Sequence, residues 1–157
     1  MKTLFILIVL VVLVIAWYLF RPEKLLISSK VNEEFPQVTE TGNPKIIFEG
    51  NFKGVAHDAA GVATIYDMGE GNRLMRFTDF TVSNGPDVHV YLVAAKDPMD
   101  SDTVKQSEIY QLGPIKGNVG NQNYELGPEV DLDKFKSVVI WCKRFGVNFA
   151  VAQLEPK

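Results

Sequence analysis

The chain is poor in metal-binding and cross-linking side chains, with one cysteine and two histidines in 157 residues. One cysteine cannot form a disulfide within its own chain, which excludes a disulfide framework and a Cys-rich zinc site. Disorder is excluded as well, because 46% of the residues are hydrophobic and 10 Phe, 5 Tyr and 2 Trp can fill a core. This length allows one domain of ordinary size with an appendage.

Basic residues are scarce outside the first 24 positions. That segment holds Lys2, Arg21, Lys24 and Glu23, which leaves 13 Lys and Arg against 18 Asp and Glu in the remainder. An acidic domain lacks the basic face that nucleic acid requires, so nucleic acid is not a predicted partner.

Residues 3–20 carry no charge. As a helix they would span about 27 Å, close to the roughly 30 Å of a bilayer core. Trp17 and Tyr18 are the aromatic residues expected at a membrane interface, and Arg21 follows as a cation on the water side. The pattern predicts one transmembrane helix within an anchor over residues 1–21, with the lipid bilayer as the partner of residues 3–20.

The alternative is a cleaved signal peptide, with Lys2 as its basic start and Ala16 at a passable cleavage site. Cleavage there would leave the apolar run at the new terminus, which favours the uncleaved anchor. Long downstream domains are exported largely regardless of local charge. The expected location is therefore the cell membrane, with a single pass and the folded domain outside the cytoplasm.

Residues 22–44 mix prolines with serines and charged side chains, which predicts an extracytoplasmic linker. From residue 45 to 157, short β-like runs alternate with turn residues, and beyond residue 21 the only helix-like piece is a single turn at Asp131–Phe135. The fold class is therefore predicted as all-β, an antiparallel sandwich or barrel of about eight strands. The predicted strands are 46–52, 62–66, 74–82, 88–94, 109–112, 123–126, 137–142 and 148–154.

Cys142 ends one of these runs. Strand alternation puts Val138, Ile140 and Cys142 on one face, which predicts a buried, inert thiol. The functional alternative uses Arg144, two residues further on, to stabilise a thiolate.

His57 and His89 are weak candidates for metal ligands. His89 shares a strand face with Asp87 and Tyr91, a position where a histidine is usually solvated or hydrogen-bonded. A blue-copper centre would combine histidines with Cys142 and a methionine, but no His or Met follows Cys142. No metal site is predicted.

Four segments together resemble the electron-transfer DM-thirteen domain family, over about residues 48–154. They are Gly50-Asn51-Phe52 followed by His57, the run from Gly85 to Leu92, the run from Gly117 to Tyr124, and Val139 to Phe145. The resemblance implies an all-β module that bacteria carry in secreted or membrane-anchored form. It also implies a redox role for the cysteine at the position of Cys142.

The resulting functional hypothesis is a membrane-anchored, extracytoplasmic DM-thirteen-like domain with a redox role centred on Cys142. The alternative is a non-catalytic surface module that binds a protein or ligand and uses Cys142 only as core. No cofactor is predicted, and the sequence favours a domain that is not an enzyme. The expected partners are a redox protein or a cell-surface protein.

Overall fold

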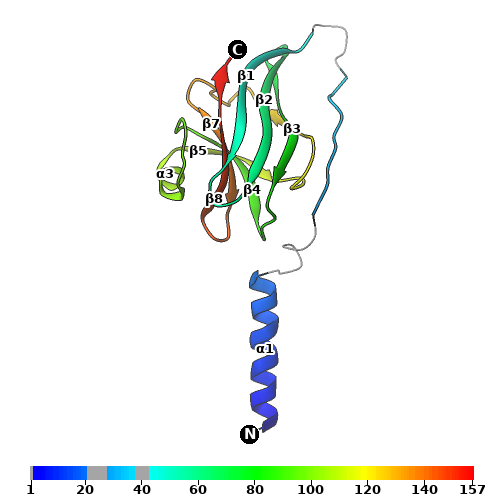
Figure 1. The fold of residues 1–157 in the computed structure, drawn as a ribbon, viewed down its shortest axis with the longest axis vertical. Coiled ribbons are helices and arrows are strands. Elements are labelled where there is room, and N and C mark those ends of the chain that lie inside the picture. The colour runs from blue at the N-terminus through cyan, green and yellow to red at the C-terminus, as the bar shows by residue number, and fades with distance from the viewer. Residues whose placement is uncertain (1, 21–27, 38–42) are drawn as a thin grey trace.

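The computed structural model describes residues 2–20, 28–37 and 43–157. Helix α1 (Lys2–Phe20) lies at one end of a β domain (Figure 1). The large apolar side chains of α1 are exposed, from Leu4 (63%) to Tyr18 (73%). The helix predicted over residues 3–20 is thus confirmed, but its transmembrane character is not, because no helix in the described ranges is both long and apolar enough to cross a membrane. Arg21, predicted as a cation on the water side, lies outside the described residues.

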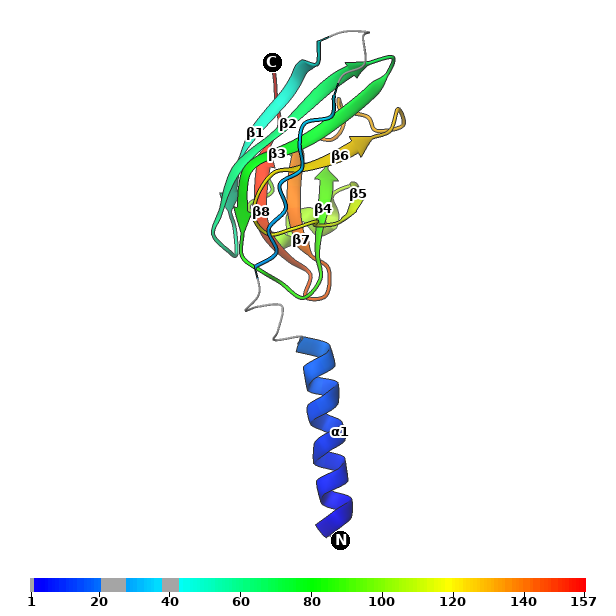
Figure 2. The ribbon, with the colours of Figure 1, turned by 90° about the vertical axis from the view of Figure 1, so that its right-hand side faces the viewer.

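The β domain is a nearly closed antiparallel barrel (Figures 1 and 2). Its strands follow the order β5-β4-β7-β8-β1-β2-β3-β6, and the short β9 pairs with β1. The predicted all-β antiparallel class and all eight predicted strands are confirmed. Their bounds are β1 (Lys45–Gly54), β2 (Ala59–Gly69), β3 (Asn72–Val82), β4 (Val88–Val93), β5 (Ile109–Pro114), β6 (Gln122–Leu126), β7 (Ser137–Cys142), β8 (Val147–Gln153) and β9 (Glu155–Pro156).

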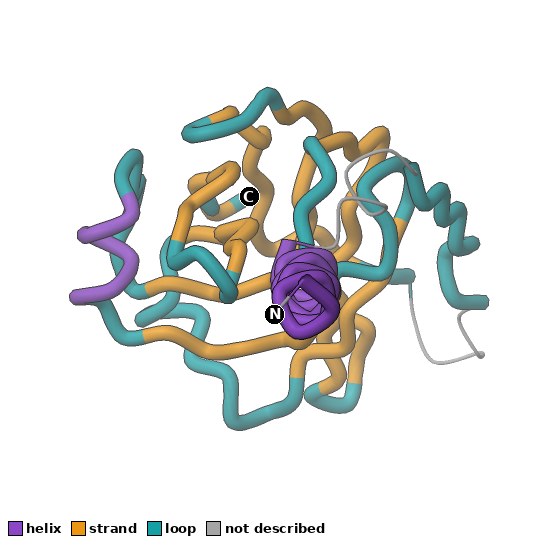
Figure 3. The backbone as a smooth tube through the Cα atoms, turned by 90° about the horizontal axis from the view of Figure 1, so that it is seen from below, coloured by secondary structure: helices purple, strands orange, loops and turns teal. Residues whose placement is uncertain are grey.

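Strand alternation determines which side chains fill the barrel. On β7, Val138, Ile140 and Cys142 belong to the main core, whereas Val139 and Trp141 belong to a second apolar cluster on the outer face. Every residue of β7 is buried, because this outer cluster includes a side chain of helix α3 (Ser101–Gln106). Seen along α1, helix α3 lies at the periphery of the domain (Figure 3).

Helix α3 corrects the expectation that no helix follows residue 21. It begins at the N-cap Asp100, whose carboxylate accepts hydrogen bonds from the backbone N–H and the hydroxyl of Thr103, both at 2.7 Å. Val104 is the one residue of this six-residue helix that is fully buried, so no apolar stripe marks it in the sequence. The predicted turn at Asp131–Phe135 is confirmed, with the Phe135 N–H donating to the Asp131 carbonyl at 3.0 Å.

Residues 28–37, here called the strap, run along the barrel from the end nearest α1 (Figure 2). The backbone N–H of Val31 donates to the carbonyl of Val119 at 2.9 Å, and that of Glu33 donates to the carbonyl of Asn121 at 3.0 Å. The sequence assigns the strap to the linker 22–44, whereas the structure binds it to the loop between β5 and β6. Of the other linker residues, 22–27 and 38–42 lie outside the described ranges, and 43 and 44 directly precede β1.

Candidate functional site

Cys142 is the last residue of β7 and is completely buried. Its partners across the sheet are Val88 of β4 and Val147 of β8. The inward orientation expected from alternation is confirmed, since the Cys142 side chain belongs to the main core. The thiol is therefore shielded from solvent in this conformation.

Arg144 is exposed in the turn between β7 and β8. Its guanidinium group donates a hydrogen bond to the carbonyl of Tyr18 at 3.2 Å, near the carboxyl end of α1. A cation is favourable there because unpaired carbonyl groups give that end of a helix partial negative charge. Strand alternation stops before Arg144, since the chain turns directly after Cys142. Stabilisation of a thiolate by Arg144 stays a prediction.

His89 and Asp87, which the sequence places on one strand face, form a direct pair. The imidazole Nε2 lies 2.8 Å from a carboxylate oxygen of Asp87. The other ring nitrogen, Nδ1, is buried and has no hydrogen-bond partner among the described residues. Asp87 lies in the turn directly before β4 and not on the strand itself, and its carboxylate is already engaged by a residue of that strand.

An aromatic pair continues this outer face. The rings of Tyr91 and Trp141 are stacked, with centroids 6.3 Å apart and an interplanar angle of 27°. Burial and the nearby Asp87 carboxylate raise the pKa of the Tyr91 phenol above its ordinary value. Tyr91 therefore remains a neutral phenol at physiological pH.

His57 lies in the loop between β1 and β2, and its ring packs against Phe149 with centroids 4.0 Å apart. The two histidines thus contact different residues: His57 packs against Phe149, and His89 is hydrogen-bonded to Asp87. Among the described residues, no three side chains of His, Cys, Asp or Glu are grouped so that they could hold a metal ion.

Two buried amides organise the loop between β5 and β6. Gln122, which is fully buried, donates to the carbonyl of Gly117 at 2.7 Å and accepts from the hydroxyl of Tyr124 at 2.8 Å. Asn118 accepts from the backbone N–H of Ser29 at 2.7 Å and donates to the carbonyl of Val82 at 3.2 Å. The run from Gly117 to Tyr124, which is part of the resemblance, thus joins the strap to the end of β3.

Glu33 of the strap is held by a charged partner. Its carboxylate accepts hydrogen bonds from the Lys116 ammonium at 2.8 and 2.9 Å and from the Asn123 backbone N–H at 2.7 Å. Burial alone would raise the pKa of Glu33, but these hydrogen bonds and the positive charge of Lys116 lower it below its ordinary value. Sequence analysis did not find this pair, because the two residues lie 83 positions apart.

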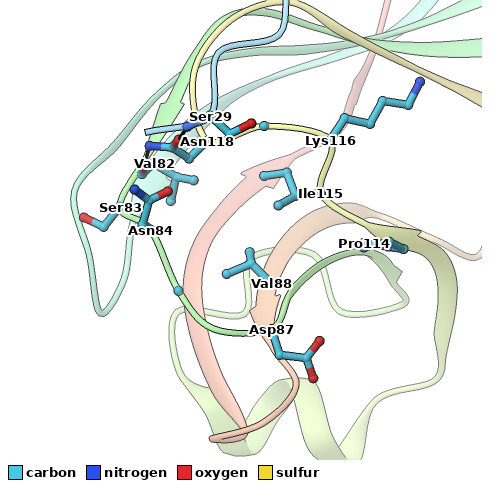
Figure 4. Close-up of a pocket in the computed structure, with 12 residues that line it drawn as sticks. Ser29, Val82, Ser83, Asn84, Asp87, Val88, Pro114, Ile115, Lys116 and Asn118 are labelled. Carbon is cyan, nitrogen blue, oxygen red and sulfur yellow. Dashed lines mark hydrogen bonds between the residues drawn. The ribbon is translucent and has the colours of Figure 1, made fainter. Parts of the chain in front are cut away.

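A pocket of about 390 Å³ opens between the start of the strap, the β3–β4 connection and the β5–β6 loop. Figure 4 shows Val88 and Ile115 pointing toward one another across it, while the Asp87 carboxylate and the Lys116 ammonium point away from its centre. Ser29, at the start of the strap, also lines the pocket, which therefore lies toward the end of the barrel nearest α1 (Figure 2).

The pocket and the buried thiol share one neighbour. Val88 lines the pocket and lies directly opposite Cys142 on the adjacent strand. Side chains directly opposite each other on neighbouring strands lie on the same face, with Cβ atoms about 5 Å apart. Val88 is therefore a neighbour of both the pocket and Cys142.

Comparison with known proteins gives one match. The family model described as electron transfer DM13 matches residues 51–154. The match covers most of the barrel, including Cys142, and excludes α1 and the strap. No curated protein matches the chain, and no solved structure does.

Proposed function

The chain belongs to the electron transfer DM13 (DM-thirteen) family, and we propose that it is an electron-transfer domain with Cys142 as its redox-active group. Membership of the family supports the redox role. The observation that carries the choice of Cys142 is its place directly opposite Val88, a residue that lines the pocket. In this proposal, a displacement of the Val88 side chain opens a path from the pocket to the sulfur.

The chemistry of this proposal needs a second thiol, since the chain has no other cysteine. The thiol of Cys142 and the thiol of a partner lose two protons and two electrons when their sulfurs form a disulfide. The attacking group is the thiolate, which a cation close to the sulfur would favour, and Arg144 is the residue proposed for that role.

Exchange with oxidised glutathione tests this role on the full chain. Cys142 attacks one glutathione sulfur, forms a mixed disulfide and releases reduced glutathione. We expect mass spectrometry to detect one adduct on the folded chain, which excess reduced glutathione removes, and no adduct on Cys142→Ser. Formation of the adduct only under unfolding conditions would refute the redox role of Cys142.

A second candidate is a non-catalytic surface module that binds a protein partner. The complete burial of Cys142 favours it, because a buried cysteine can serve simply as a small apolar core residue. In that case Cys142→Ala lowers the free energy of unfolding by about 1–2 kcal/mol, as a modest core truncation does, and glutathione leaves the folded chain unmodified.

We also propose that α1 inserts into a lipid bilayer and holds the barrel outside the cytoplasm. The proposal is supported by the uncharged run 3–20 and by the exposure of its large apolar side chains. Protease added to intact cells should remove residues 45–157 and leave cytoplasmic proteins intact. Protection of the domain would reverse the orientation, and a mature chain that begins near residue 17 would replace the anchor with a signal peptide.

A further inference from the structure

The interior of the pocket beside Val88 is apolar. Val82, Val88, Pro114 and Ile115 all line it, and the first two are buried members of the core. A pocket of about 390 Å³ has the volume of a small-molecule site, for which an apolar lining with a few polar groups is typical.

The charged side chains at the edge of the pocket are already paired. The Lys116 ammonium donates to both carboxylate oxygens of Glu33 and to the carbonyl of Asn123. The Asp87 carboxylate is hydrogen-bonded to His89. In Figure 4, the Asp87 carboxylate and the Lys116 ammonium both point away from the centre of the pocket. A phosphate or carboxylate ligand would therefore meet an ammonium group that is already neutralised, so the lining favours an uncharged ligand.

The uncharged polar residues of the lining are suited to a carbonyl compound. They include Ser29 with its hydroxyl group and the amide residues Asn84 and Asn118. Hydroxyl and amide N–H groups donate hydrogen bonds to carbonyl oxygens. An apolar ring with carbonyl oxygens at its edge would combine both features of this pocket.

We propose that the pocket binds a neutral, lipid-soluble quinone as the electron carrier of this domain. The inference rests on the proposed electron-transfer function and names the compound with which electrons are exchanged. Reduction of the quinone to a hydroquinone takes up the two electrons and two protons that the Cys142 thiol and a partner thiol lose when they form a disulfide. A quinone is an uncharged ring with two carbonyl oxygens, and it partitions into lipid, which α1 would hold close to the pocket end of the barrel (Figure 2). Phosphate-bearing carriers such as flavin nucleotides do not match a pocket whose cation is engaged by Glu33.

The test is methyl NMR of the full chain in lipid nanodiscs, titrated with menadione and with anthraquinone-2-sulfonate as a negatively charged quinone. We expect saturable menadione shifts of the Val82, Val88 and Ile115 methyl groups, and binding at least about tenfold weaker for the sulfonate. Shifts spread evenly over the barrel, or equal affinity for the two quinones, would refute the pocket.

Two matched variants test whether menadione binds in this pocket. Ile115→Trp fills the pocket and should weaken menadione binding at least about tenfold, whereas Ile109→Trp on the exposed part of β5 should leave it unchanged. If Ile115→Trp does not fold, Ser29→Phe at the pocket edge takes its place with the same expected result, because the contacts of Ser29 with Asn118 and Val119 use its backbone. Unchanged binding in the folded pocket variant would overturn the inference.

The titration is repeated on Cys142→Ala to separate the two proposals. Menadione binding that persists there, while glutathione leaves the wild-type chain unmodified, would retain the quinone site and remove the thiol role. A reversible glutathione adduct on Cys142 without menadione shifts would retain the redox function and refute the quinone site.

Discussion

Val88 of β4 lies directly opposite Cys142 of β7, and both side chains face the core, but Val88 also lines the pocket. Val88 is thus the position at which access from the pocket to the sulfur can be tested. Two residues along the same strand, Val90 is fully buried opposite Ile140 and is not part of the pocket lining. The two valines form a matched pair for testing the thiol.

Val88→Ala should expose Cys142 to alkylation in the folded full chain. If the Val88 side chain closes the path from the pocket to the sulfur, removal of its two methyl groups opens that path, and iodoacetamide should react faster than global unfolding allows. Val90→Ala costs a similar 1–3 kcal/mol of stability through its cavity but opens no path. Mass spectrometry measures alkylation and denaturant unfolding measures stability. Equal alkylation rates in the two variants, once corrected for stability, would show that the pocket gives no access to the thiol.

Gly120→Ala should detach the strap. At Gly120 a Cβ would lie 1.9 Å from the carbonyl oxygen of Val31, and the φ angle of +103° also disfavours any other residue. Gly113→Ala is the control, because its φ angle of +109° is similar and a Cβ there would meet no atom within 4 Å. Both variants bear about 1–2 kcal/mol of backbone strain, and Gly120→Ala should lose about 1–2 kcal/mol more through lost strap contacts.

Hydrogen exchange at the Val31 and Glu33 amides measures the strap directly. These amides should exchange faster in Gly120→Ala and at the wild-type rate in Gly113→Ala. Slow exchange at both amides in Gly120→Ala would mean that the strap tolerates the side chain.

The strap should loosen in acid because of Glu33. The folded-state pKa of this carboxyl group lies below the ordinary value of 4.5, so the stabilisation is fully present above that value. It is lost as pH falls through the folded-state pKa, where the carboxylate becomes protonated and releases Lys116. The effect at neutral pH is about 1 kcal/mol or less, since both side chains are partly exposed.

Urea unfolding of Glu33→Gln and Glu34→Gln checks this dependence. Glu33→Gln should remove part of the wild-type acid sensitivity, whereas Glu34→Gln should retain it, because Glu34 uses its backbone carbonyl to accept from Asn123. An identical pH profile for wild type and Glu33→Gln would show that the carboxylate does not hold the strap.

Leu10→Lys should release the chain from membranes. A lysine at the centre of an inserted helix costs about 3 kcal/mol, whereas Leu10→Ile changes little. Carbonate extraction of membranes followed by immunoblotting measures the retained fraction. Retention of the lysine variant at the wild-type level would contradict insertion of α1.

The eight barrel strands and the inward face of Cys142 could be predicted because they depend on local pattern. Period-two alternation, with Val138, Ile140 and Cys142 on one side, specifies a strand face without knowledge of its partner. Helix α3 escaped prediction although its N-cap Asp100 is a local signal, because one buried residue gives no helical period.

What the sequence by itself determined was therefore the positions of the strands along the chain, the apolar α1 and the burial of the thiol, since each follows from residues that are neighbours in the chain. The tertiary structure alone decided that Val88 lies beside both Cys142 and a pocket and that Glu33 binds Lys116. These contacts join residues as far as 83 positions apart. They exist because β4 pairs with β7 and because the strap crosses the β5–β6 loop, and a single strand's alternation specifies its faces but not its neighbours.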